Sequence, residues 1–329
     1  MANLIKNTIQ LTNNYFIAPL RQKTSTTSFW YLSEPANIKT EKELDSYKDT
    51  SPSPFFLIDY RKKLKYTLKN NDDIIVLPYN KPIGHQINPE AAFQYALGLH
   101  DQHHFTQDNF WLNEFFRYVH YFAVRQTAKG HWQYTFDWYA AKAPWSSALA
   151  QARGAAVMLR AYLHSHDDRY IQIAKKAVQP FQTSIEDGGF LHIFAPEKCY
   201  YFEEYPPIPT GVINGFMSTL MCLWELSYWL QEKWLEDLWQ IGIQSLEKML
   251  PHYSTGWWSL YDLDERTPIQ NVNSPRYHLL EIHYLQVLKC LSSSKIIKDE
   301  YHKRIKQYHN PLLRSMALGK KIVRKVLYK

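Results

Sequence analysis

Residues 146–184 read SSALAQARGAAVMLRAYLHSHDDRYIQIAKKAVQPFQTS, and this stretch decides the fold. Its apolar and small residues recur at three- and four-residue spacing, which predicts helices over 146–164 and 168–184. Ser146 and Asp168 stand at the two starts, where their side chains can cap a first helical turn. The stretch therefore predicts two helices joined by a very short connection.

The same layout continues on both sides of this pair. Pro89 can stand in a first helical turn, and an apolar face follows it. Further helices are expected over 108–127, 210–230, 232–250, 277–291 and 298–308. Because short and long connections alternate, we predict a mainly α protein, an (α/α) toroid or barrel of paired helices. In such a ring the long connections gather at one end and form a cleft.

Both ends of the chain differ from this helical body. Residues 1–78 are rich in Thr, Ser and charge, and their short apolar runs at 15–17, 55–58 and 74–77 predict strands or extended arms. We therefore expect an irregular, partly β N-terminal arm over 1–78 and a helical-barrel domain over 79–312. A basic amphipathic tail is expected over 313–329.

The positive charge of the chain is concentrated in that tail. The formal net charge is +7, and residues 314–329 carry six cations and no acid, which leaves about +1 for the rest. A body with so little charge argues against nucleic-acid binding. The tail predicts either peripheral contact with an anionic membrane or a solvated helix with one face on the body.

The cysteines and the start of the chain indicate a compartment. Cys199, Cys222 and Cys290 form neither a metal-binding spacing nor a disulfide framework, which favours a reducing environment. The sequence has no leader-like start and no segment long enough to span a bilayer. We predict a cytoplasmic protein, peripheral to the inner membrane if the tail binds lipid, and leave a homodimer open.

A dense group of acids and aromatics lies at 200–209, YYFEEYPPIP. Adjacent Glu203 and Glu204 cannot both face one way along an extended backbone. One carboxylate can point into a cleft while the other ties down a neighbouring loop, and the prolines stiffen the segment. The alternative is a buried aromatic loop with two solvated acids.

Two further segments combine aromatic and polar side chains. Residues 253–263, YSTGWWSLYDL, place Trp258 near Tyr261 and offer a stacking wall with a polar end. Tyr277 opens a helix in which Glu281 shares its face, with His278 beside them. Each segment taken alone is equally compatible with packing on the helical core.

Taken in order, these motifs resemble the catalytic domain of D-glucuronyl C5-epimerases, including the heparosan-modifying enzymes. The resemblance is carried by YFEEYP at 201–206, NGF at 214–216, MLPHYSTG at 249–256, YDL at 261–263 and YH at 277–278. It extends in order over roughly 83–290. The chain departs from the family pattern after YDL, where Asp264 and Glu265 precede Arg266, and at Glu281, where the family has a second histidine.

The resemblance implies a helical barrel that inverts C5 of D-glucuronate within a polysaccharide to give L-iduronate. It implies catalytic roles for Tyr205, Tyr261, Tyr277 and Glu204, and substrate-site roles for Asn214 and His278. It also implies a glucuronate-containing polymer, such as heparosan, as the partner.

The chemistry itself asks for these residue types. Removing hydrogen from a carbon next to a carboxylate requires that the growing charge be stabilised by cations or donors. Inversion also requires an acid/base group on each ring face, and tyrosine serves if its pKa is lowered. Candidate carboxylate partners are Arg153, Arg266 and Arg276, with Trp258 as a sugar-stacking wall. This reaction needs no metal and no cofactor, and no metal-ligand spacing is visible.

Other functions remain open at this stage. A polysaccharide lyase would share the first step and then expel the C4 substituent. A glycoside hydrolase would need two carboxylates, such as Glu204 with Asp262 or Asp137. A glycan-binding protein without catalysis is the fourth alternative.

Overall fold

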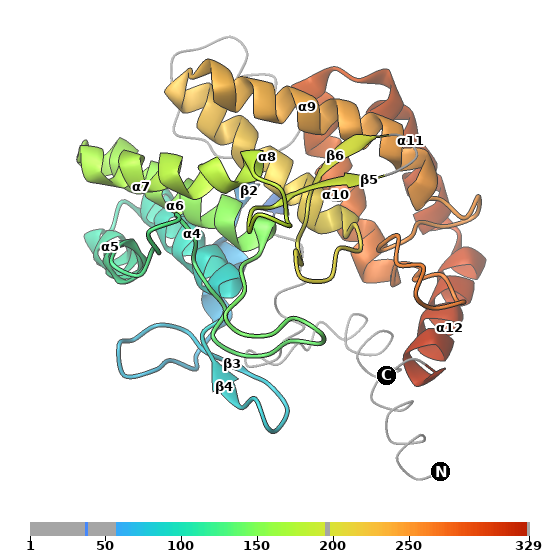
Figure 1. Ribbon diagram of the computed structural model, residues 1–329, viewed down its shortest axis with the longest axis horizontal. Coiled ribbons are helices and arrows are strands. Elements are labelled where there is room, and N and C mark those ends of the chain that lie inside the picture. The colour runs from blue at the N-terminus through green and yellow to red at the C-terminus, as the bar shows by residue number, and fades with distance from the viewer. Residues whose placement is uncertain (1–36, 39–56, 195–197, 328–329) are drawn as a thin grey trace.

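Four helix hairpins form the body of the molecule (Figure 1). The computed structural model describes residues 37–38, 57–194 and 198–327. Its hairpins pair α4 (Pro89–Thr106) with α5 (Asn109–Ala123), α6 (Ala148–Ser165) with α7 (Asp168–Val178), α8 (Ile213–Leu230) with α9 (Lys233–Met249), and α10 (Pro275–Ser292) with α11 (Lys295–His309). The first helix of each hairpin also packs on the first helix of the next, in the order α4, α6, α8, α10. This arrangement of an inner and an outer row confirms the predicted mainly α, (α/α) toroid architecture.

The hairpins share a common turn. Each first helix ends in a residue with left-handed backbone: Gln107, His166, Gln231 and Ser293 have φ between 51° and 58°. In three hairpins the next residue caps the second helix through its side chain: Asp108, Asp167 and Ser294. The predicted caps Ser146 and Asp168 are each one residue off, since Ser147 and Asp167 accept the first-turn hydrogen bonds. The same turn conformation therefore joins the two helices of each hairpin, although the sequence shows no exact repeat.

Close packing of the inner helices depends on small residues. A methyl group on Gly154 of α6 would collide with the Trp132 ring and with Phe93 of α4. Ala148, Ala152 and Ala155 of the same helix are fully buried. The alanine-rich face of the 146–164 segment is therefore the face that lets α4, α6 and α8 approach.

The described part of the N-terminal arm lies across these helices. β2 (Ile58–Asp59) pairs with β1 (Asn37–Ile38), and η4 (Arg61–Lys65) packs on α4. Leu57 N donates to Glu225 Oε1 of α8 at 3.0 Å, and Tyr60 N to Asp101 Oδ2 of α4 at 2.7 Å. The strand expected at 74–77 is displaced to β3 (Leu77–Pro78), which pairs with β4 (His85–Gln86). The run expected at 15–17 and most of 1–56 lie outside the described residues.

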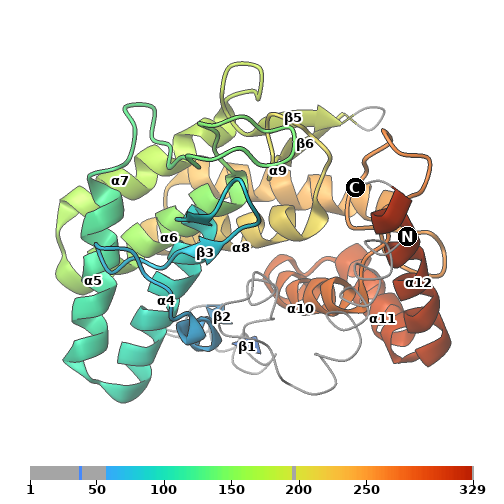
Figure 2. The ribbon, with the colours of Figure 1, turned by 90° about the horizontal axis from the view of Figure 1, so that it is seen from below.

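The long connections gather at one end of the toroid, as predicted (Figure 2). They comprise residues 124–147, the segment that contains η5 (Gln179–Gln182), β5 (Leu191–Phe194) and β6 (Cys199–Phe202), and the segment that contains η6 (Leu250–Tyr253). Backbone bonds join them: Ala148 N donates to Glu203 O at 3.2 Å, and Ile213 N to Tyr261 O at 3.2 Å. Three connections distant in sequence thus form one surface above the inner helices.

The C-terminal tail is the helix α12 (Pro311–Leu327), which packs on α10 and α11. Ala317, Leu318 and Lys321 face the body and are buried. The opposite face exposes an apolar stripe of Leu312, Met316, Val323 and Leu327. The predicted membrane contact of this tail stays a prediction. No helix among the described residues is both long and apolar enough to cross a bilayer.

Candidate active site

The two adjacent glutamates have the two different roles predicted from the sequence: one holds a neighbouring loop, and the other points its carboxylate toward the candidate site. Glu203 accepts from Gly211 N at 3.2 Å and Thr210 N at 3.4 Å, and so ties down the segment that leads to α8. Glu204 lies on the other side, against the first turn of α8. A methyl group on Gly215 would collide with Glu204 Oε2. This glycine therefore creates the space for the Glu204 carboxylate.

Two acceptor atoms at this place have no protein partner. Glu204 Oε2 and Asn214 Oδ1 are buried and make no hydrogen bond in the described structure. Val212, the residue before α8, provides no side-chain cap for the N–H groups of the first turn. A helix start favours negative charge nearby. Since buried polar atoms are normally paired, the two free acceptors mark where a ligand's donor groups would bind.

Three tyrosines come to Glu204 from different segments. Tyr205 follows it in sequence and donates a hydrogen bond to its carboxylate. Tyr261 comes from the connection after η6 and Tyr277 from the first turn of α10, and their rings meet edge to face at 5.1 Å between centroids. The charge of Glu204 raises the pKa of all three phenols, which places the carboxylate within electrostatic range of each. The structure thus brings together the four residues predicted to be catalytic.

Burial sets the protonation of this group. It raises the pKa of Glu204 to about 7, and the hydrogen bond from Tyr205 opposes that shift. Burial also raises the pKa of Tyr205, Tyr261 and Tyr277 above the usual value near 10, which is opposite to the lowering expected from the chemistry. At neutral pH the site therefore holds three neutral phenols and a carboxyl group that titrates in the physiological range. Such a carboxyl suits general acid–base catalysis.

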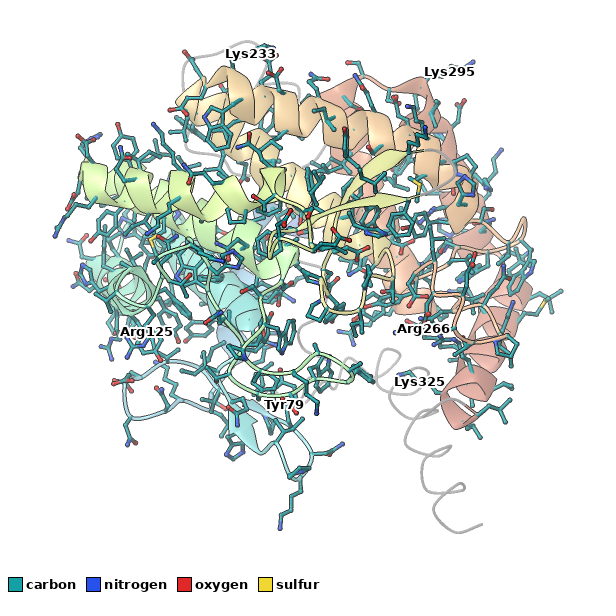
Figure 3. All side chains as sticks on the ribbon, viewed as in Figure 1. Tyr79, Arg125, Lys233, Arg266, Lys295 and Lys325 are labelled. Atoms are coloured by element: carbon teal, nitrogen blue, oxygen red, sulfur yellow. The ribbon has the colours of Figure 1, made fainter. Side chains whose placement is uncertain are left out.

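One wall of the site is aromatic. Trp145 lies between Tyr205, at 5.8 Å, and Tyr134, on which it stacks at 4.0 Å between centroids. Tyr79 joins the same cluster through Phe136 at 4.8 Å, and its position is labelled in Figure 3. The exposed Tyr139 lies in the turn between Trp138 and Ala141, which pair in an isolated antiparallel bridge, and it acts on the pKa of Tyr261. Flat aromatic faces of this kind pack well against the apolar faces of sugar rings.

The three predicted carboxylate-binding arginines have different surroundings. Arg153 is buried and paired with Glu90 of α4, and its Nη2 donates to Ser218 Oγ at 2.9 Å. Arg266 is exposed near α12 (Figure 3) and pairs with Asp264 at 2.7 Å. Arg276 lies beside Tyr277 and lowers the pKa of that phenol. Of the three, the charge of Arg276 acts on Tyr277, and that of Arg153 acts on Glu204.

The structure does not bring His278 and Trp258 to this cluster. Both are fully buried, with their rings stacked at 3.9 Å between centroids. His278 Nδ1 contacts Ser259 Oγ at 2.7 Å and Nε2 contacts Arg304 O at 3.0 Å, while Trp258 Nε1 donates to Asn273 O at 3.0 Å. One step along α10 separates Tyr277 from His278, and that step turns the histidine toward α11 instead of the site.

Sequence reasoning missed two polar residues near Tyr261, Lys321 and Asn271, which are linked to Asp262. Lys321 of α12 donates to Asn271 Oδ1 at 2.6 Å, and Asn271 Nδ2 donates to Asp262 Oδ2 at 2.6 Å. The available signal was the spacing of Ala317, Leu318 and Lys321, which puts one cation on the apolar face of a basic helix. Among residues 57–194 and 198–327, no cluster of three or more His, Cys, Asp or Glu side chains is arranged to hold a metal ion.

Comparison with known proteins identifies the family. A sequence profile described as the D-glucuronyl C5-epimerase C-terminus matches residues 125–306, more than half of the chain. The chain belongs to this family.

Individual relatives match over shorter stretches. A D-glucuronyl C5-epimerase of Caenorhabditis elegans is 31% identical over 46% of this chain and 27% of its own length. The uncharacterized protein MJ1128 of Methanocaldococcus jannaschii is 31% identical over 40% of this chain and 44% of its own length. The chain thus matches less than half the length of these curated relatives. Among solved structures, it is similar to the family 76 mannosidase Bt3792 of Bacteroides thetaiotaomicron (11% identity, 78% and 74% coverage, TM-score 0.46).

The epimerase-family region contains most of the cluster. Glu204, Tyr205, Asn214, Tyr261 and Tyr277 all lie within residues 125–306. Glu90, which pairs with Arg153, and Lys321, which lies by Tyr261, come from outside it. Side chains from both sides of the matched region therefore reach the cluster or its partners.

Proposed function

We propose that this protein is a polysaccharide uronate C5-epimerase. Its substrate would be a D-glucuronate unit in a heparosan-like or other glucuronate-containing polymer, and its product L-iduronate. The observation that carries the proposal is the buried Glu204 carboxylate, with a pKa raised to about 7, held among three partly buried tyrosines. Membership of the epimerase C-terminal family supports the choice of reaction.

The first half of the reaction would take place at Glu204 and Tyr205. Glu204 accepts a hydrogen bond from Tyr205, so a proton removed from C5 can pass through the phenol to the carboxylate. The C5–H bond breaks, and its electron pair moves into the substrate carboxylate. Arg276, which lies beside Tyr277, is the cation positioned to stabilise that charge.

The second half requires a proton donor on the other ring face. Tyr261 and Tyr277 come from separate segments and meet each other at 5.1 Å. Because burial and the Glu204 charge raise their pKa values, both are protonated and can donate at neutral pH. The phenol O–H bond breaks, the electron pair returns from the substrate carboxylate to C5, and a C–H bond forms on that side. The centre is inverted, and the glycosidic bonds stay intact.

Incubation of the protein with heparosan in D₂O, followed by NMR of the polymer, tests this proposal. The expected result is deuterium at C5 and iduronate signals, with chain length unchanged. An unsaturated product that absorbs in the ultraviolet would indicate a lyase, and new reducing ends would indicate a hydrolase. Binding without exchange on any glucuronate polymer would indicate a glycan-binding protein.

A further inference from the structure

The C-terminal helix α12 brings a cation to the candidate site. Lys321 Nζ lies 4.9 Å from the centroid of the Tyr261 ring, and only 7% of the residue is exposed. In the described structure its hydrogen bond goes to a neutral amide, Asn271 Oδ1 at 2.6 Å. A lysine so deeply buried is uncommon unless it has a charge to compensate.

The segment that carries Tyr261 is held by the same contacts. Tyr261 N donates to Asn271 O at 2.7 Å, and the Asn271 side chain links Lys321 to Asp262. Farther along α12, Arg324 Nε donates to Ile269 O and Nη2 to Thr267 Oγ1, both at 3.0 Å. The inner face of α12 therefore fixes residues 261–272, although it lies beyond the family's matched region.

Tyr261 and Lys321 are surrounded by charged groups of both signs. Tyr261 faces Glu204, Asp262, Tyr277 and Tyr139, and all four raise its pKa. Burial lowers the pKa of Lys321. Of the charges that it faces, Asp262 and Glu281 favour its charged form, and Lys325 and Arg324 oppose it. Lys321 is thus the cation whose ammonium group lies against the Tyr261 ring itself.

We propose that Lys321 is a positioning residue of the active site, which stabilises the Tyr261 phenolate left when that phenol has given its proton to the substrate. In that step the O–H bond of Tyr261 breaks, the proton goes to C5, and negative charge remains on the phenolate oxygen. An opposite charge at this range shifts a pKa by about 1–3 units. The inference rests on the proposed function and assigns Tyr261, rather than Tyr277, to the protonation step.

The direct test is independent of catalysis. Difluorotyrosine is placed at position 261, because fluorination makes the phenol acidic enough to titrate in an accessible pH range, and its ¹⁹F signal is followed against pH. In Lys321→Gln the midpoint should rise by about one unit or more, and in Lys321→Arg it should stay near that of the wild type. Lys320→Met is the matched control, since Lys320 is the neighbouring cation and contacts the same segment through Gln270 at 3.4 Å.

An unchanged midpoint in Lys321→Gln, or an equal shift in Lys320→Met, would overturn the inference. If Lys321→Gln does not fold, Asn271→Asp serves instead, because a carboxylate on Lys321 should neutralise it and raise the midpoint. C5 exchange gives the second readout, with kcat expected to fall about ten- to a hundredfold in Lys321→Gln and KM to stay within about threefold. Absence of exchange in the wild type would overturn the proposed function and leave the titration result standing.

Discussion

Two buried glutamates, Glu204 and Glu281, lie in two clusters that differ in hydrogen bonding. Burial raises the pKa of both. Both oxygens of Glu281 have partners, Asn273 Nδ2 at 2.7 Å and the Arg304 guanidinium. Glu204 Oε2 has none among the described residues, and the free Asn214 Oδ1 lies in the same turn of α8. The contrast teaches that the Glu281 carboxylate, paired on both oxygens, stabilises the fold, whereas the Glu204 carboxylate keeps one oxygen available for a ligand.

The largest difference between the clusters should appear on removing the Tyr205 hydroxyl. Tyr205→Phe should lower the rate of C5 hydrogen exchange by about 10³–10⁴-fold, because the proton then has no path to Glu204. The free energy of unfolding should change by less than about 1 kcal/mol. Exchange kinetics and denaturant unfolding on the same sample measure both. Full activity in this variant would remove Tyr205 from the mechanism.

The Glu281 cluster should respond in stability. Arg304 is fully buried and binds both Glu281 and Glu300, the latter at 2.9 Å. Arg304→Met leaves buried acids without a counter-charge, so the free energy of unfolding should fall by about 3–5 kcal/mol. The neighbouring Lys303 is partly exposed and also pairs with Glu300, at 3.1 Å. Lys303→Met should cost less than about 1 kcal/mol, and equal losses in the two variants would contradict the distinction.

The pH dependence of stability should separate Glu204 from an ordinary surface acid. Its pKa is raised in the fold, from 4.5 to about 7, so the stability that this group contributes is fully present below pH 4.5 and is lost as the pH rises through 7. Glu204→Gln does not titrate. The free energy of unfolding of Glu204→Gln minus that of the wild type should therefore rise by about 3 kcal/mol between pH 4.5 and 7. Above pH 7 this difference should stay constant. Denaturant unfolding across this range would contradict the assignment if the difference were constant.

A smaller effect should come from filling the space around Glu204. Gly215→Ala pushes a methyl group into the carboxylate and should cost about 1–3 kcal/mol and reduce exchange. Gly319 is also helical but has open space at the same position. Gly319→Ala should stabilise the protein by about 0.5–1 kcal/mol with exchange unchanged. Thermal unfolding of the two variants compares them, and a stabilised Gly215→Ala would mean that Glu204 is not held there.

The fold followed from the sequence because its rules are local. Caps such as Asp108 and the apolar spacing of 146–184 fix each helix hairpin within a few residues. The four acid and tyrosine positions followed from their order along the chain. The surroundings of these four residues could not be predicted from the sequence. Whether Tyr277 or His278 faces the site depends on how α11 packs on α10. Lys321 and Tyr261 are sixty residues apart, and no local pattern predicts that contact.

The most direct test of the account is the rate of C5 deuterium incorporation in Glu204→Gln compared with Glu281→Gln, each measured on folded protein. The account predicts that Glu204→Gln loses at least about a hundredfold in rate, while Glu281→Gln keeps the wild-type rate and loses stability. The opposite pattern, with exchange retained in Glu204→Gln and abolished in folded Glu281→Gln, would contradict it.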